Sequence, residues 1–333
     1  MILPLAVHAM RTRFELVLIG DDPSHLRAVG EEALEEIVAV EARLSRFDKS
    51  SVVTRINRHA AQEAVRVDAD TFALLAECER LWHETQGAFD PTIGPLMRSL
   101  GLQDACAAGS RELTVEEARA AVGWRTVELD GENHTVRFQH RDTSIDLGAI
   151  GKGYALDLAA AILSEHDVHR AILHGGTSTS IALGAPPQCA GWRIALGSPK
   201  LDKEARVLEL CDEALSVSER TVEQRAHAAH VIDPQTGRAA TGAERVAVRV
   251  HDAKPLAGCG HSFAASRADA WSTALLVRSD LTLPDSVARE SWSETQSFRD
   301  DFASGSRPDR SIATRALPAK RDGRHPTQIT QTS

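Results

Sequence analysis

The sequence predicts an α+β protein with a mixed β-sheet core and flanking helices. In the first part of the chain, apolar residues recur at helical spacing over residues 26–45 and 71–85. After residue 125 the apolar period changes to two, the period of a strand with one buried face. Because helices and strands follow each other without regular βαβ alternation, a doubly wound parallel sheet is not favoured.

The N-terminal elements are a strand and two helices. Residues 14–20 predict the first strand, and the helix over 26–45 follows it. In the second helix, over 71–85, Asp70 is placed to cap the N-terminus and Gly87 lies just past the C-terminus.

The middle of the chain changes from helices to strands. Thr114 and Glu117 have the spacing of a capping box, which predicts a short third helix ending at Gly123. Residues 126–129 and 135–138 flank an Asp-Gly turn and predict a β-hairpin. Further strands are predicted over 170–173, 178–183, 192–196, 207–210 and 245–250.

Composition excludes several classes of protein. The 47 acidic and 38 basic residues give a net charge of −9 without a basic stripe, so nucleic acid is not an expected partner. No run of 18 apolar residues predicts a membrane span. The apolar start of the chain is too short for a signal peptide, and the five cysteines are widely separated, so we expect a cytoplasmic protein.

The C-terminal segment differs in composition from the rest. From residue 279 the chain is rich in Ser, Arg, Asp, Thr and Pro, with isolated apolar residues and no sustained period. Such a segment buries too little apolar surface to fold. We therefore expect residues 279–333 to be a poorly ordered tail.

A glycine-rich loop over 148–153 is the first candidate for chemistry. It follows strand-like residues and precedes a predicted helix over 154–163, so its backbone and the helix N-terminus favour an anion. Lys152 adds a positive charge. The loop matches neither a Walker A motif nor Gly-x-Gly-x-x-Gly, and a tight connection is the alternative interpretation.

Two further segments carry candidate ligands. Asp269 and Thr273 are four residues apart, hence on one face of a helix, and offer the hard oxygen ligands that Mg²⁺ prefers. A helix cap with a solvated threonine is the alternative. His230 begins an apolar segment that enters an Asp-Pro turn, where a histidine is either structural or a proton donor and acceptor near a phosphate.

Taken in order along the chain, these segments resemble the ApbE-like FAD:protein FMN transferases. The resemblance runs from about Met10 to Val277. The matching segments are Met10-Arg11-Thr12, Leu44-Ser45-Arg46-Phe47-Asp48 with Asn57, Phe89-Asp90-Pro91-Thr92, and residues 146–154, 230–237 and 268–273.

The resemblance implies that residues 1–278 form a catalytic domain and that its reaction uses FAD and Mg²⁺. A threonine hydroxyl of an acceptor protein attacks the FMN-side phosphorus of FAD, and AMP leaves. Asp146 or His230 assists removal of the threonine proton. The metal ligands implied are Asp269, Thr273 and the carbonyl of Ala149. The residues implied to contact FAD are Met10, Phe47, Asn57, Phe89, Asp90, Pro91, Asp146, Lys152 and His230.

Three residues depart from the family pattern. Arg11 and Glu219 stand where the family has glycines, and Thr177 stands where an aspartate commonly follows two glycines. If the glycine replaced by Glu219 has a positive φ, the loop is strained by about 1 kcal/mol. These departures motivate one alternative, a flavin-binding protein without catalysis. A second alternative shares the same site: an FAD pyrophosphatase that yields FMN and AMP, with water in place of the threonine.

Overall fold

The computed structural model describes residues 1–103, 112–196, 206–220, 231–251 and 261–290, which belong to one compact unit. Its helices are α1 (Pro23–Leu44), α2 (Val52–His59), α3 (Ala69–Glu84), α4 (Gly94–Ser99), α5 (Val115–Ala120), α6 (Gly151–Glu165) and α7 (Ala264–Val277), with 3-10 turns η1 (Pro91–Ile93) and η2 (Trp124–Thr126). Its strands are β1 (Ile2–Ala9), β2 (Thr12–Ile19), β3 (Val65–Arg66), β4 (Val127–Asp130), β5 (Thr135–Phe138), β6 (Ala171–Gly175), β7 (Thr179–Leu183), β8 (Trp192–Leu196), β9 (Arg206–Leu210), β10 (Glu213–Glu219), β11 (Arg245–His251) and β12 (Val287–Glu290).

Seven strands form the main sheet, in the order β1-β2-β6-β7-β10-β11-β12. All of its described pairings are antiparallel, which is more regular than the predicted mixed sheet. Hairpins join β1 to β2 and β6 to β7, whereas β7 and β10 pair across the intervening β8 and β9. The predicted α+β class is confirmed.

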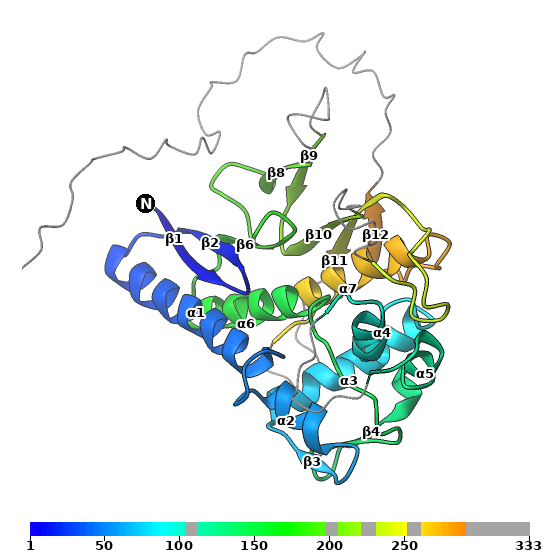
Figure 1. Ribbon diagram of the computed structural model, residues 1–333. Coiled ribbons are helices and arrows are strands. Elements are labelled where there is room, and N and C mark those ends of the chain that lie inside the picture. The colour runs from blue at the N-terminus through cyan, green and yellow to red at the C-terminus, as the bar shows by residue number, and fades with distance from the viewer. Residues whose placement is uncertain (104–111, 197–205, 221–230, 252–260, 291–333) are drawn as a thin grey trace, which may run out of the picture. The chain divides into compact units, whose positions relative to one another are not determined.

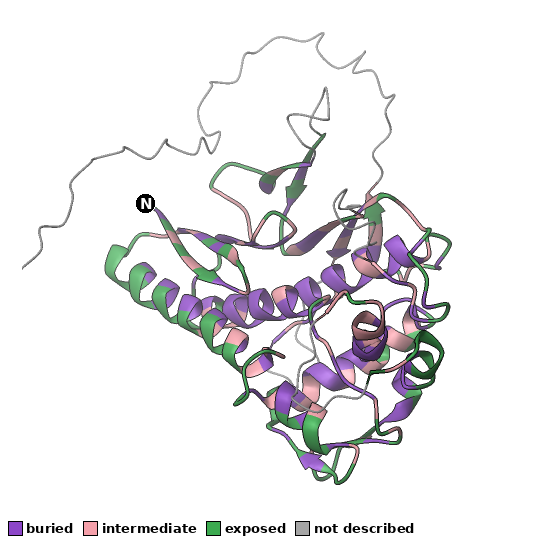
Figure 2. Cartoon of the chain, in the orientation of Figure 1, coloured by how far each residue is buried: buried purple, intermediate pink, exposed green. Residues whose placement is uncertain are grey.

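Helices α1, α6 and α7 pack against one face of this sheet (Figure 1). Figure 2 shows that α6 and α7 are buried along most of their length, whereas α1 exposes its outer side. A helix that is apolar on all sides must be covered on all sides. This holds for α7, because β10 and β11 contact it, α6 lies beside it and α3 also packs on it.

The other face of the sheet carries a second, smaller core under the β8–β9 hairpin. Trp192 and Leu196 from β8 and Leu208 and Leu210 from β9 pack with sheet residues such as Ile172. The sheet is therefore buried on both faces at its centre, which explains the continuous burial of β7 residues Thr179 to Ala182.

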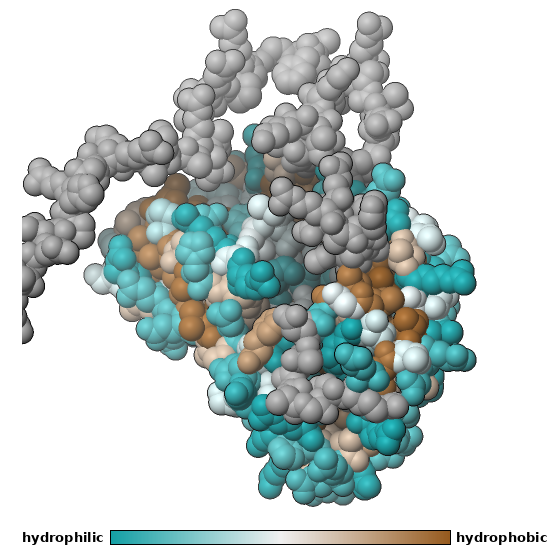
Figure 3. All heavy atoms as spheres, viewed as in Figure 1, coloured by the Kyte–Doolittle hydropathy of each residue, from teal (hydrophilic) through white to brown (hydrophobic). Residues whose placement is uncertain are grey.

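The remaining elements form a lobe below the helix layer, where β3, β5 and β4 make a small antiparallel sheet beside α2 to α5. Trp124 is buried in the core. Hydrophilic side chains predominate on the part of this lobe seen in Figure 3. No helix within the described residues is both long and apolar enough to cross a membrane.

Several sequence predictions need correction. Strand β1 was not predicted, and it pairs with β2 over its whole length. Asp70 does not cap α3. The cap is Asp68, whose Oδ1 accepts a hydrogen bond from the Thr71 amide, so that Asp70 falls inside the first turn. The capping box of Thr114 and Glu117 is present, but α5 ends at Ala120 and not at Gly123.

The predicted boundary at residue 278 is also wrong. Strand β12 lies beyond it and pairs with β11, with Val287 opposite Val250. Leu281 and Val287 are both buried in the core. The folded unit therefore includes residues 279–290, and the rest of the predicted tail, 291–333, lies outside the described residues.

Candidate active site

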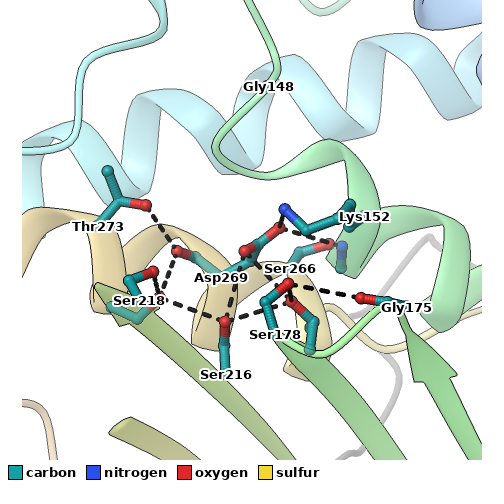
Figure 4. A network of polar contacts seen from close by, with 12 residues as sticks. Gly148, Lys152, Gly175, Ser178, Ser216, Ser218, Ser266, Asp269 and Thr273 are labelled. Carbon is teal, nitrogen blue, oxygen red and sulfur yellow. Dashed lines mark hydrogen bonds and ion pairs between the residues drawn. The ribbon is translucent and has the colours of Figure 1, made fainter. Parts of the chain in front are cut away.

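The carboxylate of Asp269 is buried where α7 meets α6 and the sheet (Figure 4). Its Oδ1 accepts hydrogen bonds from Thr179 Oγ1 on β7 at 3.3 Å and Ser216 Oγ on β10 at 3.4 Å. Its Oδ2 accepts one from the Gly153 amide at 3.3 Å and lies 3.5 Å from Lys152 Nζ. Both carboxylate oxygens are therefore fixed in orientation by three different elements.

Hydroxyl groups continue this polar network along α7. Ser272 Oγ and Thr273 Oγ1 donate to the Asp269 carbonyl at 2.9 and 3.2 Å, and Ser272 Oγ is 2.7 Å from Ser218 Oγ on β10. Thr273 lies one turn after Asp269, as the spacing predicts. Because its proton is donated to a carbonyl, the oxygen lone pairs of Thr273 stay available to a cation.

These residues fit a magnesium ion held jointly with phosphate groups. Within the described ranges no three His, Cys, Asp or Glu side chains group together to hold a metal, so a cation at Asp269 would need further ligands that are not such side chains. Mg²⁺ is commonly bound by one or two carboxylates together with waters and substrate phosphates. Ala149 is half-buried in the loop before α6, and its role as a ligand stays a prediction.

The glycine-rich segment is partly helix. A loop was predicted through Gly153, but α6 begins at Gly151, so Lys152 and Gly153 lie in its first turn. Gly153 lies where α6 and α7 cross closely: a Cβ at Gly153 would lie 2.3 Å from the carbonyl oxygen of Ala265. Glycine is therefore required here for helix packing, which in turn brings Lys152 to Asp269.

Asp146 is fixed by residues that are distant in sequence. Asn57 Nδ2 donates to the Ile145 carbonyl at 2.9 Å and Asn57 Oδ1 accepts from the Ile145 amide at 2.7 Å, which sets the backbone before Asp146. The Asp146 amide donates to the Pro91 carbonyl at 2.7 Å. The structure thus brings together Asn57, Pro91 and Asp146, three residues predicted to contact FAD.

The Asp146 carboxylate has three polar partners of its own. Gly148 donates its amide to Oδ1 at 2.8 Å, and Gln103 Nε2 donates to Oδ2 at 2.6 Å. Arg46 Nε lies 3.3 Å from the same Oδ2. The guanidinium of Arg46 also lies 4.0 Å from the ring centroid of Phe47. Phe47 is 62% exposed, and an exposed ring of this size offers a stacking surface for a planar group.

Phe89 and Asp90 are less accessible than the resemblance implied. Phe89 is buried in the main core, and its amide donates to Thr85 Oγ1 at 3.1 Å. Asp90 accepts hydrogen bonds from the Thr92 amide and hydroxyl and from Trp82 Nε1 at 3.0 Å. Burial raises the pKa of Asp90 to about 6, against the effect of these donors.

The segment after His230 lies beside the Asp90 loop. His230 itself falls outside the described residues. Gln235 Nε2 donates to the Gln86 carbonyl at 2.8 Å, and Gln235 and Asp90 both line a cavity of about 400 Å³ with Trp82. The two segments, which are well separated in sequence, therefore line the same cavity.

Met10 and Arg11 form the two-residue turn between β1 and β2. Their φ angles are 49° and 61°, the left-handed region that favours glycine. The Met10 amide donates to Glu41 Oε1 on α1 at 2.7 Å. Arg11 is exposed at the turn, so its departure from glycine costs backbone energy rather than space.

The other two departures behave differently. Glu219 ends strand β10 in register with Arg245 and does not have a positive φ, so the strain expected there is absent. Its carboxylate lies 3.3 Å from Arg245 Nη2. Thr177 is exposed in the turn between β6 and β7, where Gly176, with a φ of 69°, supplies the left-handed residue.

Sequence reasoning missed the residues that orient the two carboxylates. Thr179 and Ser216 reach Asp269 only because β7 and β10 are neighbours, which no local pattern reveals. Gln103 reaches Asp146 from a loop. Arg46 is part of the family-like segment Leu44-Ser45-Arg46-Phe47-Asp48, which was the available signal.

The fold and the site together define an α+β protein in which one buried aspartate, one lysine and several hydroxyls meet between two core helices and the sheet. The chain belongs to the ApbE family, whose model matches residues 10–290. This confirms the predicted family, and the match extends to the end of β12.

Known proteins agree with this assignment. The chain is 27% identical over 293 residues to the FAD:protein FMN transferase of Escherichia coli K12, covering 84% of this chain and 80% of that protein. It is 27% identical over 227 residues to the FAD:protein FMN transferase of Vibrio cholerae, covering 65% and 66%. The crystal structure of the ApbE protein of Thermotoga maritima superposes with a TM-score of 0.70 at 29% identity, covering 83% and 87%.

Proposed function

We propose that the chain transfers FMN from FAD to a threonine hydroxyl of an acceptor protein and releases AMP, with Mg²⁺ bound at Asp269. The observation that carries the proposal is the meeting of Lys152 and Asp269 at the start of α6. It supplies a carboxylate for the cation and an ammonium for a phosphate at one place. Curated relatives in the family are FAD:protein FMN transferases.

The reaction is a phosphoryl transfer. The threonine Oγ forms a bond to the FMN-side phosphorus, and the bond from that phosphorus to the bridging oxygen breaks, so that AMP carries that oxygen away. When bound, Mg²⁺ would neutralise charge that develops on the phosphate oxygens. Asp269, Thr273 and the Ala149 carbonyl would hold it, and Lys152 would bind a phosphate oxygen.

The remaining predicted residues would orient FAD and accept a proton. Phe47 offers an exposed ring for stacking against the flavin or the adenine. Asp146, oriented by Arg46 and Gln103, or His230 takes the proton of the attacking hydroxyl. Proton removal by a positioned base is a general contribution to such reactions.

One argument for a non-catalytic protein is weakened by the local geometry of β10. Glu219 sits in a regular strand, so it does not distort the site by backbone strain. Arg11 is exposed on a turn. A cytoplasmic location stays a prediction.

Incubation with FAD, Mg²⁺ and a threonine-bearing acceptor tests the function. Flavin fluorescence that stays on the denatured acceptor, with release of an equal amount of AMP, is expected. Free FMN and AMP without a labelled acceptor would indicate the pyrophosphatase, and bound intact FAD without turnover would indicate the non-catalytic protein.

A further inference from the structure

Helix α7, which carries Asp269, has no cap from its own N-terminal residue. Phe263 stands at the N-cap and supplies no side-chain hydrogen bond, and the first turn contains no acidic residue. The first amides of a helix need acceptors, and a carboxylate is favoured there by the helix dipole.

Ser262 Oγ accepts from the Ala264 amide at 3.0 Å, and Asp157 on α6 supplies acceptors for the next two amides. Its Oδ1 accepts a hydrogen bond from the Ala265 amide at 2.8 Å. Its Oδ2 accepts from the Ser266 amide at 2.8 Å and from Ser266 Oγ at 2.6 Å. Asp157 is 2% exposed, so these three bonds replace the water that the carboxylate has lost.

The same face of α6 contacts α7 a second time, one turn earlier. Gly153 precedes Asp157 by four residues, and its amide donates to Asp269 Oδ2 at 3.3 Å. On α7, Ala265 likewise precedes Asp269 by four residues. Two positions one turn apart on α6 therefore bond to two positions one turn apart on α7. Asp157 bonds to the start of α7, and Gly153 bonds to Asp269.

We propose that Asp157 is a positioning residue for the metal site: by capping α7 from α6, it sets the place of Asp269, and of Thr273 on the same helix, relative to Lys152 on α6. This rests on the proposed function, because it assumes that Asp269 binds the cation. Asp157 does not touch the cation or FAD. It acts through the backbone of Ala265 and Ser266.

The alternative is that Asp157 only stabilises the fold. A general loss of stability would lower the amount of folded protein but leave the metal affinity of the folded fraction unchanged. A shift of Asp269 would change that affinity itself. Replacement of groups that orient a metal ligand typically weakens metal binding by about 10- to 100-fold.

The test measures binding of Mn²⁺, a probe for Mg²⁺, to the whole chain in the presence of FAD. Electron paramagnetic resonance detects the bound ion. Asp157→Asn keeps the side-chain shape but turns an NH₂ donor toward one of the α7 donors. We expect its Mn²⁺ dissociation constant to rise about tenfold or more. Thermal unfolding is recorded for each variant to show that it is folded.

Leu163→Ala is the matched control. Leu163 is fully buried on α6, away from the α7 cap, so its loss weakens the fold without touching Asp157 or Asp269. Its Mn²⁺ affinity should equal that of the unsubstituted protein. If Asp157→Asn does not fold, Ser266→Ala removes only one of the three bonds and should give a smaller rise.

The outcomes separate the two proposals. Equal Mn²⁺ affinity of the unsubstituted protein and the folded cap variant would overturn the positioning role but leave the transferase proposal intact. An equal loss of Mn²⁺ affinity in Leu163→Ala would also overturn the positioning role, because the loss of affinity would then follow the loss of stability. Absence of Mn²⁺ binding by the unsubstituted protein with FAD would overturn both.

Discussion

Lys152 Nζ lies 3.5 Å from Asp269 Oδ2 and joins the first turn of α6 to the centre of α7. The Lys152 side chain is 26% exposed, whereas that of Asp269 is 4% exposed. The ammonium is therefore on the solvent side of the carboxylate, where a cation or a phosphate would approach. The Lys152 ammonium should therefore weaken the binding of a cation at Asp269 and strengthen the binding of a phosphate.

Lys152→Met should change metal binding and FAD binding in opposite directions. Without FAD, loss of the competing ammonium should strengthen Mn²⁺ binding at Asp269 by up to about fivefold, since a partly exposed ion pair contributes about 1 kcal/mol or less. FAD binding should weaken, because a phosphate loses its cationic partner. Isothermal titration of each ligand alone measures both changes.

Lys152→Arg is the control, because it keeps the charge at this position. It should leave metal binding without FAD close to that of the unsubstituted protein. If Lys152→Met binds Mn²⁺ no better and FAD no worse, the ion pair has no part in either site.

Asp269→Ala should abolish metal-dependent turnover and leave the fold largely intact. The fold should tolerate the loss because the hydroxyls of Thr179 and Ser216, which now contact Oδ1, are 3.2 Å apart and can bond to each other. Turnover with and without Mg²⁺, together with circular dichroism, checks both parts.

Asp280→Asn controls for the loss of one negative charge near α7, since its side chain is 83% exposed. It should retain normal turnover. Full Mg²⁺-dependent activity of the Asp269 variant would refute the metal assignment.

Arg11→Gly should stabilise the protein. Arg11 has a φ of 61°, which costs a residue with a side chain about 1–2 kcal/mol. The extra entropy of glycine in the unfolded chain offsets about 0.5–1 kcal/mol, so the net gain in the free energy of unfolding is up to about 1.5 kcal/mol. Urea denaturation measures it.

Arg13→Gly, two residues later in the extended strand β2, should instead lower stability, because there glycine adds entropy without relieving strain. A loss of stability in both variants would show that the turn carries no strain.

Asp90 predicts a specific pH dependence of stability. Burial raises its pKa to about 6 in the folded state, from 3.8. The folded protein therefore binds more protons than the unfolded chain between these values, so stability falls as pH rises from about 4 to about 6. Such a difference in pKa corresponds to a loss of about 3 kcal/mol from this group.

Asp90→Asn removes that titration. Its stability relative to the unsubstituted protein should rise by up to about 3 kcal/mol as pH increases from 4 to 7, as urea denaturation at each pH would show. A difference between the two proteins that does not change with pH would contradict the raised pKa.

The sequence predicted elements whose signal is local. The capping box of Thr114 and Glu117 and the hairpin over 126–138 depend on neighbouring residues, and both are present. Strand β1 was missed because its apolar residues are interrupted by Pro4, which an edge strand tolerates. Strand β12 was missed because a single short strand in polar sequence has no period to detect.

Site residues could be predicted where they belong to a sequence motif. They could not be predicted where the pairing of strands places them in the site. Asp269 and Thr273 share a helix face, as their spacing required. The hydroxyls of Thr179 and Ser216 reach Asp269 only through the register of β7 and β10. Glu219 was expected to strain a turn because its conformation was inferred from a replaced glycine, whereas the chain is extended there.

The most direct test of the account is the fate of the flavin when the protein, FAD and Mg²⁺ meet an acceptor carrying a target threonine. Mass spectrometry of the acceptor should show one FMN attached to that threonine, with an equal amount of AMP released, and neither product when Asp269→Ala replaces the unsubstituted protein. AMP and free FMN without a modified threonine would contradict the transferase assignment.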